Sequence, residues 1–66
     1  MQIRLNGQIR SIPEELSLAQ LLAQLEVDPR HAAVAVNLEV VPHSEREIKK
    51  VHEGDEVEVF HAVGGG

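Results

Sequence analysis

The sequence contains no cysteine, tryptophan or tyrosine, and Phe60 is its only aromatic residue. The absence of thiols excludes disulfides, thiolate zinc sites and cysteine nucleophiles, so any reactive sulfur would have to be carried on another group. Because aromatic residues are almost lacking, the core must come from leucine, isoleucine and valine. A chain of 66 residues buries only about 60% of its unfolded surface. These limits predict one small domain with little room for a deep active site.

Long apolar runs and a basic stripe are also lacking. The first ten residues alternate polar and apolar, and no later stretch approaches membrane-spanning length, so we expect a cytoplasmic protein. We also expect the free protein to be a monomer. A formal charge of −5 makes nucleic acid an improbable partner. An acidic surface would favour a basic patch on another protein, or would serve solubility alone, and both interpretations stay open.

The N-terminal half predicts a hairpin. Residues 1–5 alternate with the period of a half-buried strand, and Asn6-Gly7 supplies the two positive-φ positions of a type I′ turn. A second, antiparallel strand is expected over residues 8–12, where the alternation is less regular.

A short helix should follow Pro13. Ser17 and Gln20 have the spacing of a capping box, and leucines at 18, 21, 22 and 25 form one apolar stripe. Asp28-Pro29 is expected to end the helix. Because the stripe must be buried, this helix needs a sheet to lie on.

The C-terminal half predicts further strands. Residues 33–36 suit an interior strand, a turn at 37–39 leads into Val40-Val41, and Pro42 marks a sheet edge or the end of pairing. Residues 43–50 are polar, residues 53–55 form a tight turn, and residues 56–62 form the last strand. The order is that of an α+β fold with a small mixed sheet covered on one face by a single main helix. If the last strand lies beside the first, the two ends of the chain meet at the sheet centre.

The sequence ends on a glycine run, Val63-Gly64-Gly65-Gly66, after a domain expected to span residues 1–63. Glycines cost backbone entropy and contribute no packing, so folding gives no reason for them. A tail without side chains could enter a narrow slot in a partner and present the Gly66 carboxylate there. Conversion to a mixed anhydride with AMP would let a sulfur or amine nucleophile take the acyl carbon. A frayed end or a tag remnant is the alternative.

Alternation in the last strand places Glu56, Glu58 and Phe60 on one face, away from Val57 and Val59. We expect Glu56, Glu58 and Phe60, together with Val63, to form a partner surface. The alternative is that the segment after Pro42 covers Phe60 as part of a satellite core.

Other polar residues give weaker signals. The four histidines, at positions 31, 43, 52 and 61, lie in different segments without metal-ligand spacing, so surface histidines are favoured over a metal site. Glu45 and Glu47 flank Arg46, which is typical of a solvated face.

Three groups of residues carry a resemblance to a known family. These are Val34-Ala35-Val36-Asn37 with Val40-Val41-Pro42, Glu53-Gly54-Asp55-Glu56-Val57, and the terminal Val63-Gly64-Gly65-Gly66. In their order and over nearly the whole chain they resemble the ThiS family, the sulfur carriers of thiamine biosynthesis. The resemblance implies a ubiquitin-like β-grasp fold and a protein cosubstrate that is not itself an enzyme.

The resemblance also implies the chemistry of the tail. A ThiF-like adenylyltransferase, using ATP and magnesium, would adenylate Gly66. A cysteine-derived persulfide would convert the adenylate to a thiocarboxylate, and a ThiG-like thiazole synthase would take the sulfur. The small subunit of molybdopterin synthase resembles this family in fold and is the alternative sulfur carrier. That family commonly has prolines before its tail, where this sequence has His61-Ala62-Val63, so the thiamine family is favoured. A ubiquitin-like modifier joined to target lysines through Gly66 and a plain binding module are the remaining alternatives.

Overall fold

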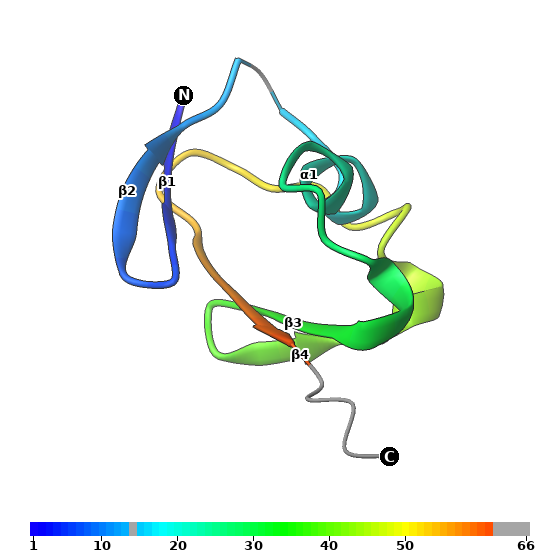
Figure 1. Ribbon diagram of the computed structural model, residues 1–66. Helices are drawn as coiled ribbons and strands as arrows, with labels where there is room; N and C mark the ends of the chain where they lie inside the picture. Colours follow the sequence, from blue (N-terminus) through cyan, green and yellow to red (C-terminus); the bar gives the residue numbers. More distant parts are fainter. Residues whose placement is uncertain (14, 62–66) are drawn as a thin grey trace.

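The fold is given by a computed structural model that describes residues 1–13 and 15–61 (Figure 1). It opens with the predicted hairpin, in which β1 (Gln2–Leu5) pairs antiparallel with β2 (Gln8–Ser11). Asn6 and Gly7 have φ values of 49° and 83°, which a type I′ turn requires. The second strand ends at Ser11, one residue earlier than predicted.

Helix α1 (Leu18–Gln24) begins with the predicted capping box. The Ser17 hydroxyl accepts from the Gln20 N–H at 3.1 Å, and the Gln20 side chain accepts from the Ser17 N–H at 2.9 Å. The predicted stop at Asp28-Pro29 is wrong, because the helix ends at Gln24 and Glu26 adopts a φ of 58°. Asp28 instead caps a short 3₁₀ helix, η1 (Pro29–His31).

The second hairpin joins β3 (Ala32–Val36) to β4 (Glu39–Val41). Asn37 and Leu38 both have positive φ, at 51° and 71°, so this turn also has the geometry of type I′. Pro42 follows β4, the sheet edge on this side, as its missing N–H predicts.

The crossing segment, residues 42–55, includes a second 3₁₀ helix, η2 (His43–Glu45), and returns past the start of α1. Its carbonyls accept hydrogen bonds from the first turn of the helix, Leu18 N–H to Lys49 at 3.0 Å and Ala19 N–H to Arg46 at 3.0 Å. Helix N–H groups that would lack an intrahelical partner are thus satisfied. The segment ends in a turn at Gly54, where φ is 82°.

The last strand, β5 (Glu56–His61), lies at the centre of the sheet. The strand order is β2-β1-β5-β3-β4, with β5 parallel to β1 and antiparallel to β3. The first and last strands are therefore neighbours, as predicted. Residue 62, the last position of the predicted strand, lies outside the described residues.

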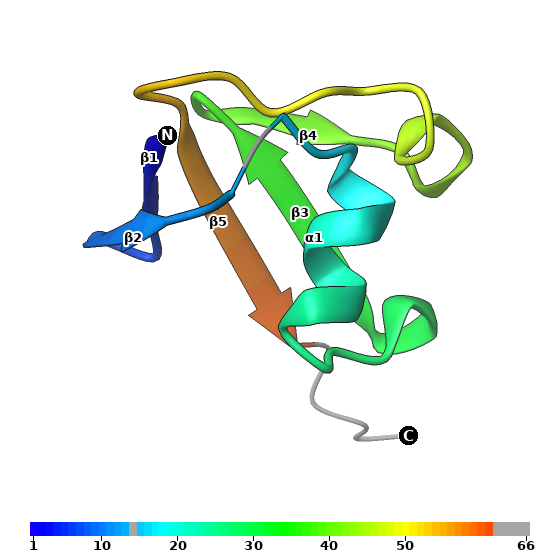
Figure 2. The same ribbon diagram turned by 90° about the horizontal axis from the view of Figure 1, so that it is seen from above.

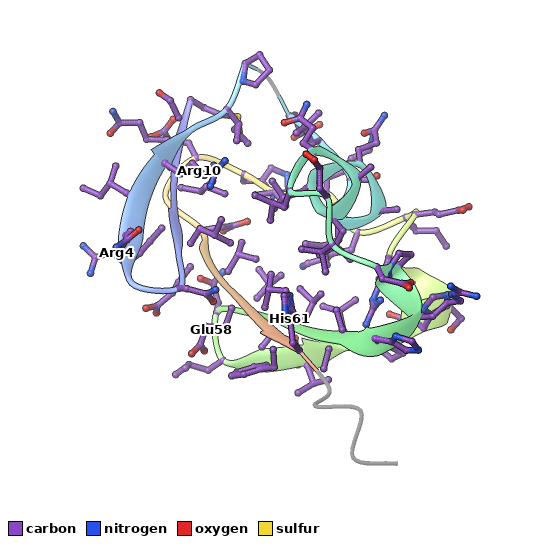
Figure 3. All side chains as sticks on the ribbon, in the orientation of Figure 1. Arg4, Arg10, Glu58 and His61 are labelled. Atoms are coloured by element: carbon purple, nitrogen blue, oxygen red, sulfur yellow. The ribbon has the colours of Figure 1, made fainter. Side chains whose placement is uncertain are left out.

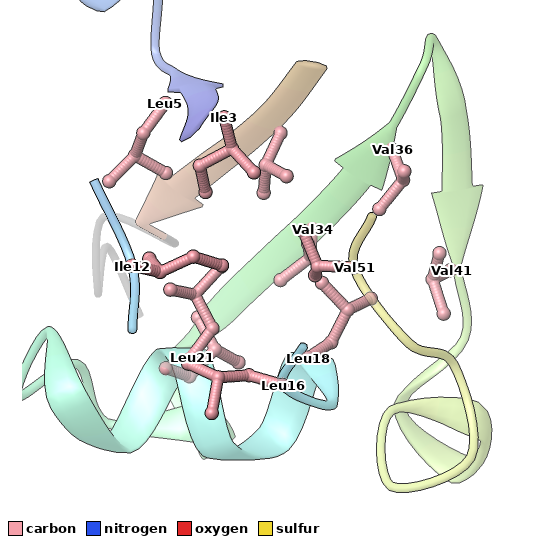
Figure 4. Packing of buried hydrophobic residues seen from close by; sticks show 12 residues of the cluster. Ile3, Leu5, Ile12, Leu16, Leu18, Leu21, Val34, Val36, Val41 and Val51 are labelled. Atoms are coloured by element: carbon pink, nitrogen blue, oxygen red, sulfur yellow. The ribbon is translucent and has the colours of Figure 1, made fainter. Parts of the chain in front are cut away.

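Helix α1 covers one face of the sheet, and among residues 1–13 and 15–61 no other α-helix covers the opposite face (Figure 2). The core lies between the helix and the sheet (Figure 4) and contains Ile3, Leu5, Ile12, Leu16, Leu18, Leu21, Leu22, Val34, Val36, Val41, Val51 and Val57. This one-helix, mixed-sheet architecture confirms the predicted α+β, β-grasp fold. The uncovered side, called the open face below, carries the alternate residues of each strand.

Candidate functional site

Strand β5 leads directly into the glycine tail, because His61 is the last described residue before residues 62–66. The predicted attachment residue Gly66, its neighbours Gly64 and Gly65, and the predicted contact residue Val63 all lie outside the described residues. The structure therefore shows the root of the tail, at the end of the central strand.

The predicted partner residues Glu56, Glu58 and Phe60 share the open face, opposite buried Val57. Figure 3 shows Glu58 and His61 leaving β5 toward opposite sides of the sheet. Phe60 is 52% exposed, which excludes the alternative that the crossing segment covers it within a satellite core. The residue paired with Phe60 on β3 is Ala33, whose methyl group is too short to cover an aromatic ring.

Apolar side chains extend across the open face beside Phe60. On β3, Ala35 pairs with Glu58 on one side and with Val40 of β4 on the other. Val40 is 68% exposed. Phe60, Ala33, Ala35 and Val40 are called the apolar strip below; Ala35 is only 5% exposed, so its exposed surface comes from Phe60, Ala33 and Val40. Large exposed apolar side chains on one face of a small domain are suited to a contact site.

The charge of the open face is mixed. Glu56 and Glu58 come from β5, but the register places Arg4 of β1 beside Glu56. In Figure 3 Arg4 points outward from the sheet, whereas Arg10, whose register partner is buried Ile3, belongs to the other face. The predicted acidic surface is therefore confined to the β5 side of the open face and ends at Arg4.

A small pocket of about 230 Å³ lies on the helix side of the tail root, and its lining includes Asp28, His31 and His61. The Arg30 side chain and backbone N–H donate to the Asp28 carboxylate, and these bonds lower the pKa of Asp28 to about 2. Asp28 therefore stays ionised near neutral pH beside the end of β5.

Arg46 contradicts the prediction of a solvated face, because it is only 6% exposed. Its guanidinium donates to the carbonyls of Pro29, at 2.9 Å, and Ala32, and lies 3.3 Å from Nδ1 of His43. Its Nε is buried without a partner among the described residues. Arg46 thus ties the crossing segment to η1 and to the first residue of β3, which pairs with His61. Its position between two exposed glutamates gave no sequence signal for this role.

The four histidines do not gather at one site, although His31 and His61 line the same pocket. His52 contacts Glu15, with Nε2 and Oε2 3.1 Å apart, while His31 and His61 lie at the tail root and His43 lies beside Arg46. Across residues 1–13 and 15–61, no group of three or more histidine, aspartate or glutamate side chains is arranged to hold a metal ion. Over the same part of the chain, no helix is long and apolar enough to span a bilayer.

Comparisons with known proteins agree with this geometry. A family model described as the ThiS family matches residues 3–66. The chain is 32% identical over 66 residues to the sulfur carrier protein ThiS of Escherichia coli, and the match covers 100% of both proteins. It is 38% identical over its full length to a thiazole synthase of Paramagnetospirillum magneticum, although it spans only 20% of that longer protein.

Solved structures show the same relation. The crystal structure of the thiamine biosynthesis protein ThiS from Geobacter metallireducens has a TM-score of 0.89 and 30% identity, with 100% of both chains covered. A solution structure of a thiamine biosynthesis protein from the same organism has a TM-score of 0.85 and 30% identity, with 100% of this chain and 88% of that chain covered. The family model spans nearly the whole chain and a curated relative matches it from end to end, so the chain belongs to the ThiS family, the sulfur carriers of thiamine biosynthesis.

Proposed function

We propose that this chain, a ThiS-family sulfur carrier, holds its sulfur as a thiocarboxylate on Gly66. The observation that supports this is the path of β5, the central strand, which is held between β1 and β3 and leads into a segment ending in three glycines. Since the sequence has no cysteine, the sulfur would be bound to the main-chain carboxyl group. The folded domain supplies the surface that partner enzymes bind, and those enzymes supply the catalysis.

The proposed sequence of reactions begins on an adenylyltransferase that binds ATP and magnesium. A Gly66 carboxylate oxygen attacks the α-phosphorus of ATP, pyrophosphate leaves, and the acyl carbon becomes an electrophile with AMP as its leaving group. The terminal sulfur of a cysteine-derived persulfide then displaces AMP. A second thiol cleaves the resulting S–S bond, which leaves the thiocarboxylate on Gly66 and a disulfide on the donor. A thiazole synthase consumes the thiocarboxylate, and these steps would take place in the cytoplasm.

The open face is proposed as the surface that partners recognise. Phe60 and Val40 would enter apolar sockets, while Glu56 and Glu58 would meet basic side chains around them, and Val63 would continue this contact toward the tail. Half-exposed Phe60 supports this proposal, because an aromatic side chain uncovered on a small acidic domain is suited to anchor an interface.

Deletion of Gly66 tests the site of adenylation. The assay is ATP–pyrophosphate exchange with a cognate adenylyltransferase, and wild type and the deletion variant are compared at the same concentration. We expect exchange with wild type and none with the variant, while circular dichroism shows both folded. Equal exchange by the two proteins would refute Gly66 as the adenylated residue.

A further inference from the structure

The backbone of β5 presents hydrogen-bonding groups to two sides. Toward β3, the Glu56 carbonyl accepts from the Asn37 N–H at 2.7 Å; toward β1, the Val57 carbonyl accepts from the Asn6 N–H at 2.9 Å. Because these directions alternate along a strand, the groups of Glu58 and Phe60 face β3, whereas those of Val59 and His61 face the β1 side.

The two sides of β5 are not equally paired. Strand β3 accompanies β5 as far as the pair Ala32 and His61. The register with β1 stops at Leu5 and Val57, because the chain turns away into the first hairpin. The last bond on that side comes from a side chain, since the Asn6 carboxamide oxygen accepts from the Val59 N–H at 2.9 Å.

Beyond that bond, the register with β1 no longer extends along β5, so one side of the strand is paired with β3 and the other is not. We call this unpaired side the half-edge. The carbonyl of Val59 and the N–H of His61 face the β1 side where the β1 register no longer extends, and no hydrogen bond from either group to another described residue is present on that side. Unpaired groups along a strand are a template for another extended chain. This half-edge belongs to the central strand, and its next residues in sequence are those of the tail.

We propose that an extended backbone segment of the adenylyltransferase pairs with the half-edge formed by Val59 and His61 and so directs the tail into the active site. The inference rests on the proposed function, because it takes that enzyme as the occupant. Gly64, Gly65 and Gly66 have no side chains by which a partner could align them, so main-chain pairing with the described end of β5 would give the partner a fixed point just before the tail. Strand β3 holds the other side of β5 in register while the partner binds.

Two variants of His61 isolate the backbone donor. His61→Pro removes the N–H, and because that group faces away from β3, no β3–β5 ladder bond is lost. His61→Ala removes the imidazole but keeps the N–H, and it is the matched control. In ATP–pyrophosphate exchange with carrier concentration varied, we expect the KM of His61→Pro to exceed that of His61→Ala by about three- to tenfold, with similar kcat. Equal KM values for the two folded variants would overturn the pairing and leave the carrier function intact.

Amide hydrogen exchange gives a second test on the wild-type chain, which does not depend on the proline variant folding. The His61 N–H should exchange rapidly in the free protein and become protected when the adenylyltransferase is added. Rapid exchange in the complex would refute the proposal. Protection that rises with carrier concentration without enzyme would assign the half-edge to a second copy and also refute it. If wild type is not adenylated at all, the carrier function itself fails.

Discussion

Truncation of Phe60 to alanine should weaken partner binding far more than folding. The side chain is 52% exposed, so about half of the roughly 200 Å² of a phenylalanine side chain is buried. At about 25 cal/mol per Å², and with alanine retaining part of this contact, the loss of unfolding free energy is at most about 2 kcal/mol. Fully buried phenylalanines cost about 3 to 5 kcal/mol when truncated.

An aromatic anchor at the centre of an interface is worth about 2 kcal/mol or more in binding, which corresponds to a roughly 30-fold rise in the KM for the carrier. The assay is ATP–pyrophosphate exchange with Phe60→Ala, alongside urea unfolding of the same variant. Ile48→Ala is the matched control, because Ile48 is 76% exposed but lies outside the sheet. An unchanged KM would refute the role of the apolar strip, and a destabilisation of about 3 kcal/mol or more would place Phe60 in the core.

Three further predictions concern the scaffold. Ser17→Ala removes the hydroxyl that accepts from Gln20 and should cost about 1 kcal/mol, lowering Tm by about 4–8 °C; an unchanged Tm would contradict the cap. Arg46→Met removes a guanidinium bonded to main-chain carbonyls and should lower the urea-unfolding free energy by about 1–3 kcal/mol. Higher stability would mean that release of a buried charge outweighs those bonds. The pKa of Asp28 is about 2, against an ordinary 3.8, so its ionised carboxylate stabilises the fold above pH 3.8 and this stabilisation is lost as pH falls toward 2. Asp28→Asn should therefore unfold more easily than wild type at pH 6, and the difference in unfolding free energy should shrink at pH 2.5. A difference that stays constant with pH would refute this.

Local patterns predicted much of the fold because their causes are local. Asn6-Gly7 determines its own turn geometry, and Ser17 with Gln20 forms a cap within one helical turn. The end of α1 could not be predicted, since the left-handed conformation of Glu26 has no glycine to signal it. Asp28-Pro29, which predicts a helix stop, instead begins the following 3₁₀ helix.

Features of the site that depend on register could not be predicted from the sequence. Alternation placed Phe60 on the correct face, but its neighbour Ala33, and the row in which Val40 lies beside Ala35, follow only from the pairing of β5 with β3 and of β3 with β4. The burial of Arg46 depends on carbonyls more than ten residues away in sequence. The half-edge of β5 likewise requires knowing where β1 leaves the sheet.

The sulfur-carrier proposal is tested most directly by the intact mass of this chain after incubation with its adenylyltransferase, ATP, magnesium and a persulfide sulfur source. A gain equal to the replacement of one oxygen by sulfur, located on Gly66 by fragmentation and absent when ATP is omitted, is the predicted result. An unchanged mass under conditions in which pyrophosphate is released, or a stable amide to another protein in place of the thiocarboxylate, would contradict it.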